Sequence, residues 1–365
     1  MTKREYSVEV NRRHAEWPAQ AGTALLLRFA VIVAGCRIFH LSLERFTTAR
    51  DATSYMAQAR AMTGDYSRLV EFDRRVFPGY PALIALTHSI LHIPFGIAGL
   101  LLNGFSVALS AVLAAYLFRD RRVGWAMAVL TPAYLLYSAI PDSEATLLVF
   151  TLAGLLLALD RNRPWVGGIL LGIACCIRPP AIFAALGGIL ALMDRQNRAS
   201  GARFVAGLVL TGLCAFVSYH AWSGNALLSL NLYKGAYSGR IFDWPFSSLL
   251  LTPWRYPVPL WKTMYTWFLA GVTILGCCAV WFEFQTQDSN SKALGRLAGV
   301  WLWANTLFVL CIGHIWGFHE FHRFMIPALP PLLWVLRRYL PDRVRIWAGI
   351  GFLSFILATF GMRIQ

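Results

Sequence analysis

Apolar stretches of spanning length recur along this chain of 365 residues, from Ala21 to Gly361, and short polar segments separate them. A helix needs about 20 consecutive apolar residues to cross the hydrocarbon core of a bilayer. The pattern therefore predicts an all-α fold, a polytopic transmembrane helical bundle of about 11 spans, with a range of roughly 10–13. The predicted spans are 21–41, 97–118, 123–140, 145–160, 165–177, 180–193, 203–222, 263–283, 297–316, 324–338 and 345–362.

Composition supports this picture and excludes a soluble protein. Hydrophobic residues make up 57% of the chain and charged residues 14%, whereas a soluble domain carries about 25% charge. The formal net charge is +15, but the basic residues stand at the ends of apolar segments and form no soluble basic module. Membrane topology explains that distribution, so we expect no nucleic-acid partner.

The basic residues also orient the bundle. With residues 1–20 on the cytoplasmic side, the inner segments hold more of the 33 Lys and Arg residues than the outer ones, while the acidic residues divide evenly. The positive-inside rule favours this orientation. No Asn-x-Ser/Thr sequon occurs, which is a weak argument against a eukaryotic secretory route. We expect a multi-pass protein of a bacterial inner membrane with a cytoplasmic N-terminus.

One apolar segment conflicts with this orientation. Residues 77–94 resemble a span, but if they crossed the membrane the basic run 119–122 would lie outside. Pro78 and Pro94 bracket the segment, so we interpret it as a juxtamembrane or re-entrant helix on the outer face. Two long outer loops result, 42–95 and 223–262.

The second of these loops is rich in Trp, Tyr and Pro, and two interpretations of it stay open. It lies either at the level of the lipid headgroups or as a lid over a site. The chain then divides into four parts. These are a cytoplasmic tail (1–20), a catalytic transmembrane module (21–222), the aromatic outer loop (223–262) and C-terminal transmembrane helices (263–365).

Three acidic residues are the candidate catalytic groups. Asp51 follows the first span by about ten residues and is placed near the outer surface, where its surroundings could tune its pKa for acid–base chemistry. Asp142 and Glu144 stand between two apolar helices, a costly position for two carboxylates. The alternative for all three is helix capping or a favourable helix dipole. The predicted topology brings them to one face.

Two arginines and three histidines lie at comparable depth. Arg178 separates two short apolar pieces, and Arg323 follows His319 and His322 at the outer end of a later span. A guanidinium binds phosphate through a two-pronged fork, although snorkelling basic anchors are the alternative. The spacing of His314, His319 and His322 does not place all three on one helical face, so we predict no metal site.

The first outer loop resembles that of the GT-C glycosyltransferases. Asp51 is followed by Tyr55, then by Gly-x-Tyr at 64–66 and Phe-Pro-x-Tyr-Pro at 77–81. The closest likeness is to the branches of the GPI mannosyltransferases and the lipid A aminoarabinose transferases, over about residues 20–195. Arg50 stands where the mannosyltransferase branch usually has Trp, so the sugar stays open. The resemblance implies that Asp51 is the catalytic base.

The leading hypothesis is therefore a glycosyltransferase that uses a polyprenyl-phosphate sugar as donor and a hydroxyl of a lipid or glycan as acceptor, on the extracytoplasmic face. We expect no cofactor, although a divalent cation stays an alternative. Predicted catalytic residues are Asp51, Asp142 and Glu144; predicted phosphate or substrate contacts are Arg178, Arg323, His319, His322, Arg50, Tyr55 and Tyr80. The alternatives are a multi-pass transporter or lipid flippase, and a non-catalytic membrane subunit.

Overall fold

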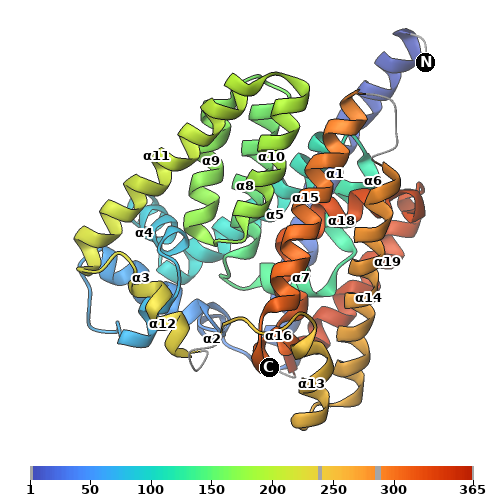
Figure 1. The fold of residues 1–365 in the computed structure, drawn as a ribbon. Coiled ribbons are helices and arrows are strands. Elements are labelled where there is room, and N and C mark those ends of the chain that lie inside the picture. The colour runs from blue at the N-terminus through green and yellow to red at the C-terminus, as the bar shows by residue number, and fades with distance from the viewer. Residues whose placement is uncertain (1–2, 237–240, 284–288, 364–365) are drawn as a thin grey trace.

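The computed structural model describes residues 3–236, 241–283 and 289–363. Over these ranges the chain is helical almost throughout and forms no β-strand; one isolated bridge pairs Phe242 with Ile312 (Figure 1). The predicted all-α membrane bundle is confirmed.

In chain order the elements are α1 (Lys3–Ile38), α2 (Leu43–Thr47), α3 (Ala52–Met62), η1 (Glu71–Arg75), α4 (Gly79–Leu91), α5 (Phe95–Leu117), α6 (Arg121–Val129), α7 (Pro132–Ala139), α8 (Glu144–Leu159), α9 (Pro164–Ile177), α10 (Ala181–Arg195), α11 (Arg198–Ser223), α12 (Leu228–Ala236), α13 (Ser247–Arg255), α14 (Leu260–Glu283), α15 (Ser289–Cys311), α16 (His314–His319), α17 (Phe321–Phe324), η2 (Ile326–Ala328), α18 (Leu329–Val335), η3 (Leu336–Tyr339) and α19 (Val344–Arg363).

The number of spans is lower than the predicted eleven. Five helices of the described chain are long and apolar enough to cross a membrane, and the bent pair α7–α8 makes a sixth if it counts as one span. The shorter helices explain the difference. Helix α9 has 14 residues and α10 has 15, so each reaches only about 20 Å at 1.5 Å per residue. Hydropathy identified these segments correctly as apolar helices, but their length does not match a full crossing.

Two predicted spans are broken at prolines. The segment 123–140 forms α6 and α7, which are separated at Thr131 with Pro132 at the start of α7. The segment 324–338 forms the end of α17 and then η2, α18 and η3, with Pro327 and Pro330 at the starts of new turns. Proline cannot donate a helical hydrogen bond and favours the first turn of a helix, which is the physical reason for both breaks.

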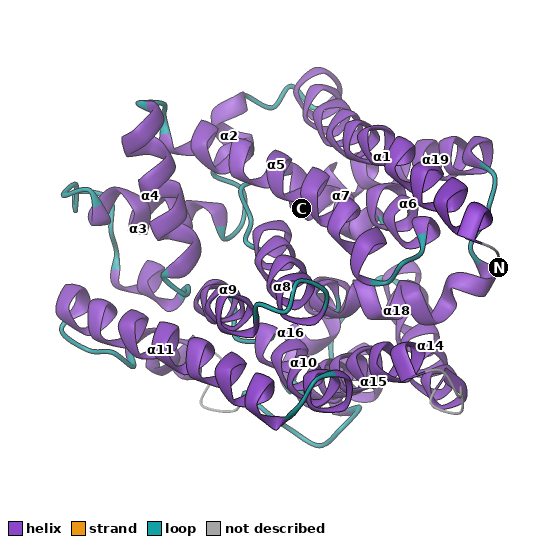
Figure 2. Cartoon of the chain, turned by 90° about the horizontal axis from the view of Figure 1, so that it is seen from above, coloured by secondary structure: helices purple, strands orange, loops and turns teal. Residues whose placement is uncertain are grey.

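Helices α8, α9 and α11 pack closely through small residues. Helix α9 lies between α8 and α11 (Figure 2). A Cβ added at Gly168 would collide with the backbone carbonyl of Phe204 on α11, and one added at Gly167 with that of Gly154 on α8. Small residues at helix interfaces permit this approach of backbones in membrane proteins.

The short helices α2, α3, α12, α13 and α16 gather at one end of the long helices, the lower end in Figure 1. The N-terminal part of α1 lies at the opposite end, together with the basic run at 119–122, because Arg121 forms an ion pair of 2.6 Å with Glu16. This is the arrangement that a non-spanning segment 77–94 requires. That segment contains α4, a helix of 13 residues, while the orientation in the membrane stays a prediction.

The predicted outer loop 223–262 contains two helices, α12 and α13, and its residues 237–240 lie outside the described ranges. Helix α12 packs against η1, and α13 against α14, α15 and α16. Trp244 and Trp254 are exposed by 82% and 83%, which is typical of aromatic side chains at a membrane surface. Apolar side chains are also exposed along α11, as expected for helices in lipid: Val209, Leu210, Leu213, Phe216 and Val217.

Candidate active site

Asp51 stands at the N-cap position of α3, but its side chain caps nothing. Its two carboxylate oxygens instead bind two arginines, Oδ1 to Arg75 Nη2 at 2.7 Å and Oδ2 to Arg323 Nη1 at 2.8 Å. The residue before it, Arg50, has a φ of 57°, a conformation that costs a non-glycine residue free energy. This turn sets the starting direction of α3 and so the place of the Asp51 carboxylate.

Asp142 and Glu144 lie at the break between α7 and α8, where the two helices meet at a bend of 105°. Both side chains are fully buried. Tyr55 of α3 steadies the break, because its hydroxyl hydrogen-bonds to Ser143 Oγ at 2.9 Å. The predicted pair of carboxylates is therefore held against the start of the first outer loop.

Arg323 joins the three acids, and each of its guanidinium nitrogens serves a different carboxylate. Nε donates to Glu144 at 2.5 Å, Nη1 to Asp51 at 2.8 Å and Nη2 to Asp142 at 2.7 Å. Arg178, the C-cap of α9, forms a further ion pair with Glu144. The two arginines that the sequence suggested for a phosphate thus bind carboxylates in the structure.

A second network extends from this cluster. The Tyr137 hydroxyl donates to Glu320 Oε2 at 2.9 Å, lies 3.1 Å from His322 Nε2 and accepts a hydrogen bond from Arg50. Arg50 also forms an ion pair of 3.5 Å with Glu320, and its guanidinium lies 4.6 Å from the centre of the Tyr137 ring. Glu320 and Arg323 are only three residues apart in the chain, so the second network lies directly beside the Arg323 cluster.

The second network borders a cavity of about 280 Å³, which we call the Lys262 cavity. Charged, aromatic and apolar side chains all line it. The lining residues are Arg50, Pro132, Ala133, Leu136, Trp261, Lys262, Tyr265, His319, Glu320, His322, Leu357 and Ala358. A site with grouped cations beside an apolar surface suits a ligand with an anionic head and a hydrocarbon tail.

The charges in the cluster fix the ionisation of its members. Burial raises the pKa of Asp51, but the charges of Arg323 and Arg75 outweigh that effect and hold the pKa at about 2. Glu320 follows the same pattern: burial opposes ionisation, while Arg323 and Arg50 bring its pKa below the usual value. Burial lowers the pKa of His322 to about 4, against the opposing charge of Glu320. At neutral pH Asp51 and Glu320 are therefore ionised and His322 is neutral.

Of the predicted site residues, Arg50, His319 and His322 line the Lys262 cavity. The acids, Arg178, Arg323 and Tyr55 form or contact the cluster beside it. Tyr80 belongs to neither group. It is fully buried, with its hydroxyl donating to Asn103 Oδ1 at 3.0 Å and its ring 5.0 Å from that of Tyr55. Tyr80 therefore packs against α3 and helps to hold that helix in place. Sequence reasoning missed several residues that the structure places in or beside the site: Arg75, Tyr137, Lys262, Tyr265 and Glu320.

Over the described residues, no group of three or more His, Cys, Asp or Glu side chains is arranged to hold a metal ion. Asp142 and Glu144 each keep one buried carboxylate oxygen without a hydrogen-bond partner. Their other oxygens bind Arg323, so a guanidinium occupies the position between the carboxylates.

No family model and no curated protein matches the chain by sequence. Among solved structures, the apo oligosaccharyltransferase of Archaeoglobus fulgidus matches with a TM-score of 0.50 and 13% identity, over 93% of this chain and 55% of that chain. The oligosaccharyltransferase AglB of the same organism, in complex with an inhibitory peptide and a dolichol-phosphate, matches with a TM-score of 0.45 and 12% identity, over 93% of this chain and 55% of that one.

The chain therefore spans little more than half the length of these enzymes. At this level of identity the likeness concerns the fold. The helical bundle is similar in fold to the apo oligosaccharyltransferase of Archaeoglobus fulgidus.

Proposed function

We propose that this protein transfers a sugar from a polyprenyl-phosphate donor to a hydroxyl acceptor. The observation that carries the proposal is the cluster in which Arg323 gathers Asp51, Asp142 and Glu144 beside the Lys262 cavity. The fold likeness to a membrane glycosyltransferase supports it.

Exposure distinguishes the roles of the three acids. The side chain of Asp51 is 23% exposed, whereas those of Asp142 and Glu144 are fully buried. Only Asp51 can therefore contact a substrate directly. We assign it as the general base, and Asp142 and Glu144 as positioning residues that fix Arg323 and, through it, the Asp51 carboxylate.

The donor phosphate fits the Lys262 cavity better than the buried arginines. Arg178 and Arg323 bind buried carboxylates and do not line this cavity, while Arg50, Lys262 and His319 line open space, Arg50 with an ion pair of 3.5 Å to Glu320. Arg50 and Lys262 carry charges that would stabilise the leaving phosphate as it develops. Leu136 and Leu357 offer apolar surface for the first isoprene units.

The reaction is then a single displacement. The acceptor oxygen attacks the anomeric carbon, the bond from that carbon to the phosphate oxygen breaks, and its electron pair leaves with the polyprenyl phosphate. Because the pKa of Asp51 is about 2, its carboxylate is ionised but weakly basic. The Asp51 carboxylate takes the proton of the acceptor hydroxyl once formation of the new bond has made that hydroxyl more acidic. Attack from the side opposite the phosphate inverts the anomeric centre.

The test is transfer by the full-length protein in liposomes that contain polyprenyl-phosphate sugars. Asp51→Asn should lower the rate by about 10²–10⁴-fold, the usual contribution of a general base. Glu71→Gln is the matched control, because Glu71 lies in the same loop, is exposed, and does not line the Lys262 cavity. Equal transfer by the wild type and folded Asp51→Asn would refute the proposed mechanism.

A second candidate, a lipid flippase or transporter, has one observation in its favour. The bent pair α7–α8 resembles the broken helices that line transport sites. The two functions separate in the same liposomes. Movement of a labelled polyprenyl phosphate between leaflets without any sugar transfer would favour the transporter.

A further inference from the structure

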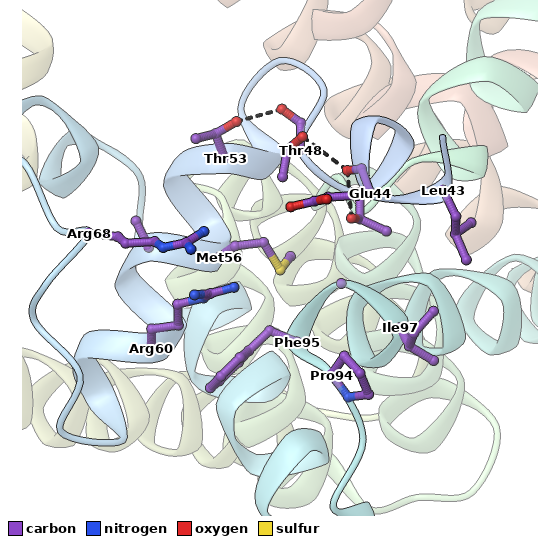
Figure 3. Close-up of a pocket in the computed structure, with 13 residues that line it drawn as sticks. Leu43, Glu44, Thr48, Thr53, Met56, Arg60, Arg68, Pro94, Phe95 and Ile97 are labelled. Atoms are coloured by element: carbon purple, nitrogen blue, oxygen red, sulfur yellow. Dashed lines mark hydrogen bonds between the residues drawn. The ribbon is translucent and has the colours of Figure 1, made fainter. Parts of the chain in front are cut away.

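A second pocket of about 360 Å³ adjoins the first outer loop, and we call it the Arg60 pocket (Figure 3). It is formed by α2, the exposed side of α3, the loop after α3 and the first turn of α5. The lining residues are Leu43, Glu44, Thr47, Thr48, Thr53, Met56, Ala57, Arg60, Arg68, Pro94, Phe95, Gly96 and Ile97.

The Arg60 pocket is separated from the Lys262 cavity by the segment that carries Asp51. Thr48 and Thr53 line the Arg60 pocket, and Arg50, between them in sequence, lines the Lys262 cavity. Asp51 follows Arg50 directly, at the start of α3. Asp51 itself lines neither pocket, but its neighbours in sequence line both. Two pockets on either side of the proposed base are the arrangement expected of an enzyme that brings a donor and an acceptor together.

The polar groups of the Arg60 pocket favour an anion. The side chains of Arg60 and Arg68 extend toward the same part of the pocket (Figure 3), and the Arg60 guanidinium lies 5.6 Å from the centre of the Phe95 ring. Neither arginine forms an ion pair with any of the described residues. Hydrogen bonds from Ser67 lower the pKa of the exposed Asp65 carboxylate, and the charges of Arg60 and Arg68 help to lower it. Two neighbouring guanidiniums can bind a phosphate with charge-assisted hydrogen bonds.

The hydroxyl and carboxylate groups lie across from these arginines. Thr53 Oγ1 donates to the carbonyl of Thr48 at 2.5 Å, so it remains able to accept a hydrogen bond. Glu44 is exposed on α2 and adds an acceptor. These groups suit the hydroxyls of a headgroup whose phosphate binds the arginines.

An apolar stripe leads away from the Arg60 pocket along α5. Ile97 lines the pocket, and Leu101 and Phe105 follow at intervals of four residues with exposures of 52% and 68%. Residues spaced by four lie on one face of a helix, and α5 is one of the candidate membrane spans. A hydrocarbon chain attached to a headgroup in the pocket would lie along this stripe.

We propose that the Arg60 pocket binds the acceptor, and that this acceptor is a membrane-embedded lipid whose headgroup carries a phosphate. Arg60 and Arg68 hold the phosphate, the stripe on α5 holds the tail, and the reacting hydroxyl lies toward Thr53 and Asp51. The acceptor role rests on the proposed glycosyltransferase function; the binding site itself does not.

Binding tests the site independently of catalysis. Full-length protein in phosphatidylcholine nanodiscs is titrated with phosphatidic acid, and separately with glycerol 3-phosphate as the soluble form of the same headgroup. Phosphatidic acid should bind saturably, and the double variant Arg60→Gln/Arg68→Gln should weaken binding at least about tenfold. Arg37→Gln/Arg45→Gln is the control: it removes the same charge from two exposed arginines outside both pockets and should bind as the wild type does.

Two outcomes of this titration overturn the proposal. Undiminished binding by a folded Arg60→Gln/Arg68→Gln protein would show that these arginines do not form the binding site. Equally tight binding of glycerol 3-phosphate would assign the pocket to a soluble phosphate and not to a lipid.

Kinetics then separate this proposal from the proposed function. The double variant should raise the KM for the lipid acceptor about tenfold or more and leave kcat near the wild-type value. Asp51→Asn should lower kcat and leave phosphatidic acid binding intact. A loss of kcat without any change in KM in the double variant contradicts an acceptor site, whereas an active Asp51→Asn protein contradicts only the proposed base.

Discussion

Arg323 is the residue on which the site depends most, and its replacement gives the most informative test of the structure. In Arg323→Gln the three carboxylates that its guanidinium binds at 2.5–2.8 Å lose their shared cation. Asp142 and Glu144 are fully buried, so water cannot replace it, although Arg178 still pairs with Glu144. Removing one partner of a buried ion pair costs about 3–5 kcal/mol. For a chain of this size, that loss lowers Tm by roughly 5 °C.

The assay is thermal unfolding of purified protein in detergent, compared with Arg45→Gln. Arg45 is exposed on α2 and forms no ion pair with the described residues, so its loss should change stability by less than about 0.5 kcal/mol. Adding Asp142→Asn to Arg323→Gln removes one unpaired buried charge and should recover about 1–2 kcal/mol.

The direction in which Asp142→Asn changes the stability of Arg323→Gln tests whether Arg323 compensates the Asp142 charge. If Asp142→Asn lowers the stability of Arg323→Gln further, the carboxylate is held by something other than the arginine. A wild-type Tm for Arg323→Gln would refute the cluster altogether.

Three further predictions concern ionisation and packing. Arg75→Gln removes one of the two charges that hold the pKa of Asp51 at about 2. The acid limb of the plot of transfer rate against pH should therefore move up by about one pH unit. Burial lowers the pKa of His322 to about 4, so the unfolded chain binds a proton at pH 5 that the folded site does not. Stability should therefore fall by about 2 kcal/mol between pH 7 and pH 5, and in His322→Gln it should not. Gly168→Ala forces a Cβ against a backbone carbonyl of α11 and should cost about 1–3 kcal/mol in thermal unfolding, whereas Gly212→Ala, with open space around it, should cost nothing.

Each of these predictions has a result that contradicts it. An unchanged acid limb in the Arg75 variant would show that Asp51 does not set the pH dependence. Equal losses of stability at pH 5 in the wild type and the His322 variant would assign the proton to another group. A Gly168 variant as stable as the Gly212 variant would show that α9 can move away from α11.

The sequence predicted the helical class and the place of the carboxylates for a simple physical reason. Buried charge is costly in an apolar setting, so the position of Asp142 and Glu144 between apolar helices was enough to single them out; the structure shows both buried against Arg323, and their role stays a prediction. Hydropathy, however, does not distinguish a helix that crosses lipid from a short helix buried among others, and the span count was wrong for that reason.

The partners of the acids were less accessible to sequence reasoning. Arg323 contacts Asp51 across 272 positions of the chain, and only the family resemblance and the predicted topology connected them. Glu320 stands in the same polar run as His319, His322 and Arg323 and could have been added on that ground. Tyr137 gave no signal, since an aromatic residue inside a predicted span is ordinary, and Lys262 marked only the start of a helix.

The residues that line the Lys262 cavity come from different helices, which matters for redesign of this protein. Trp261, Lys262 and Tyr265 all come from the first turns of α14, whereas the carboxylates come from α3 and from the break between α7 and α8. The part of the cavity lining that comes from α14 is thus on a separate stretch of chain from the carboxylates. Exchange of a few residues at the start of α14 therefore alters the cavity proposed for the donor and leaves the carboxylate cluster and its support intact.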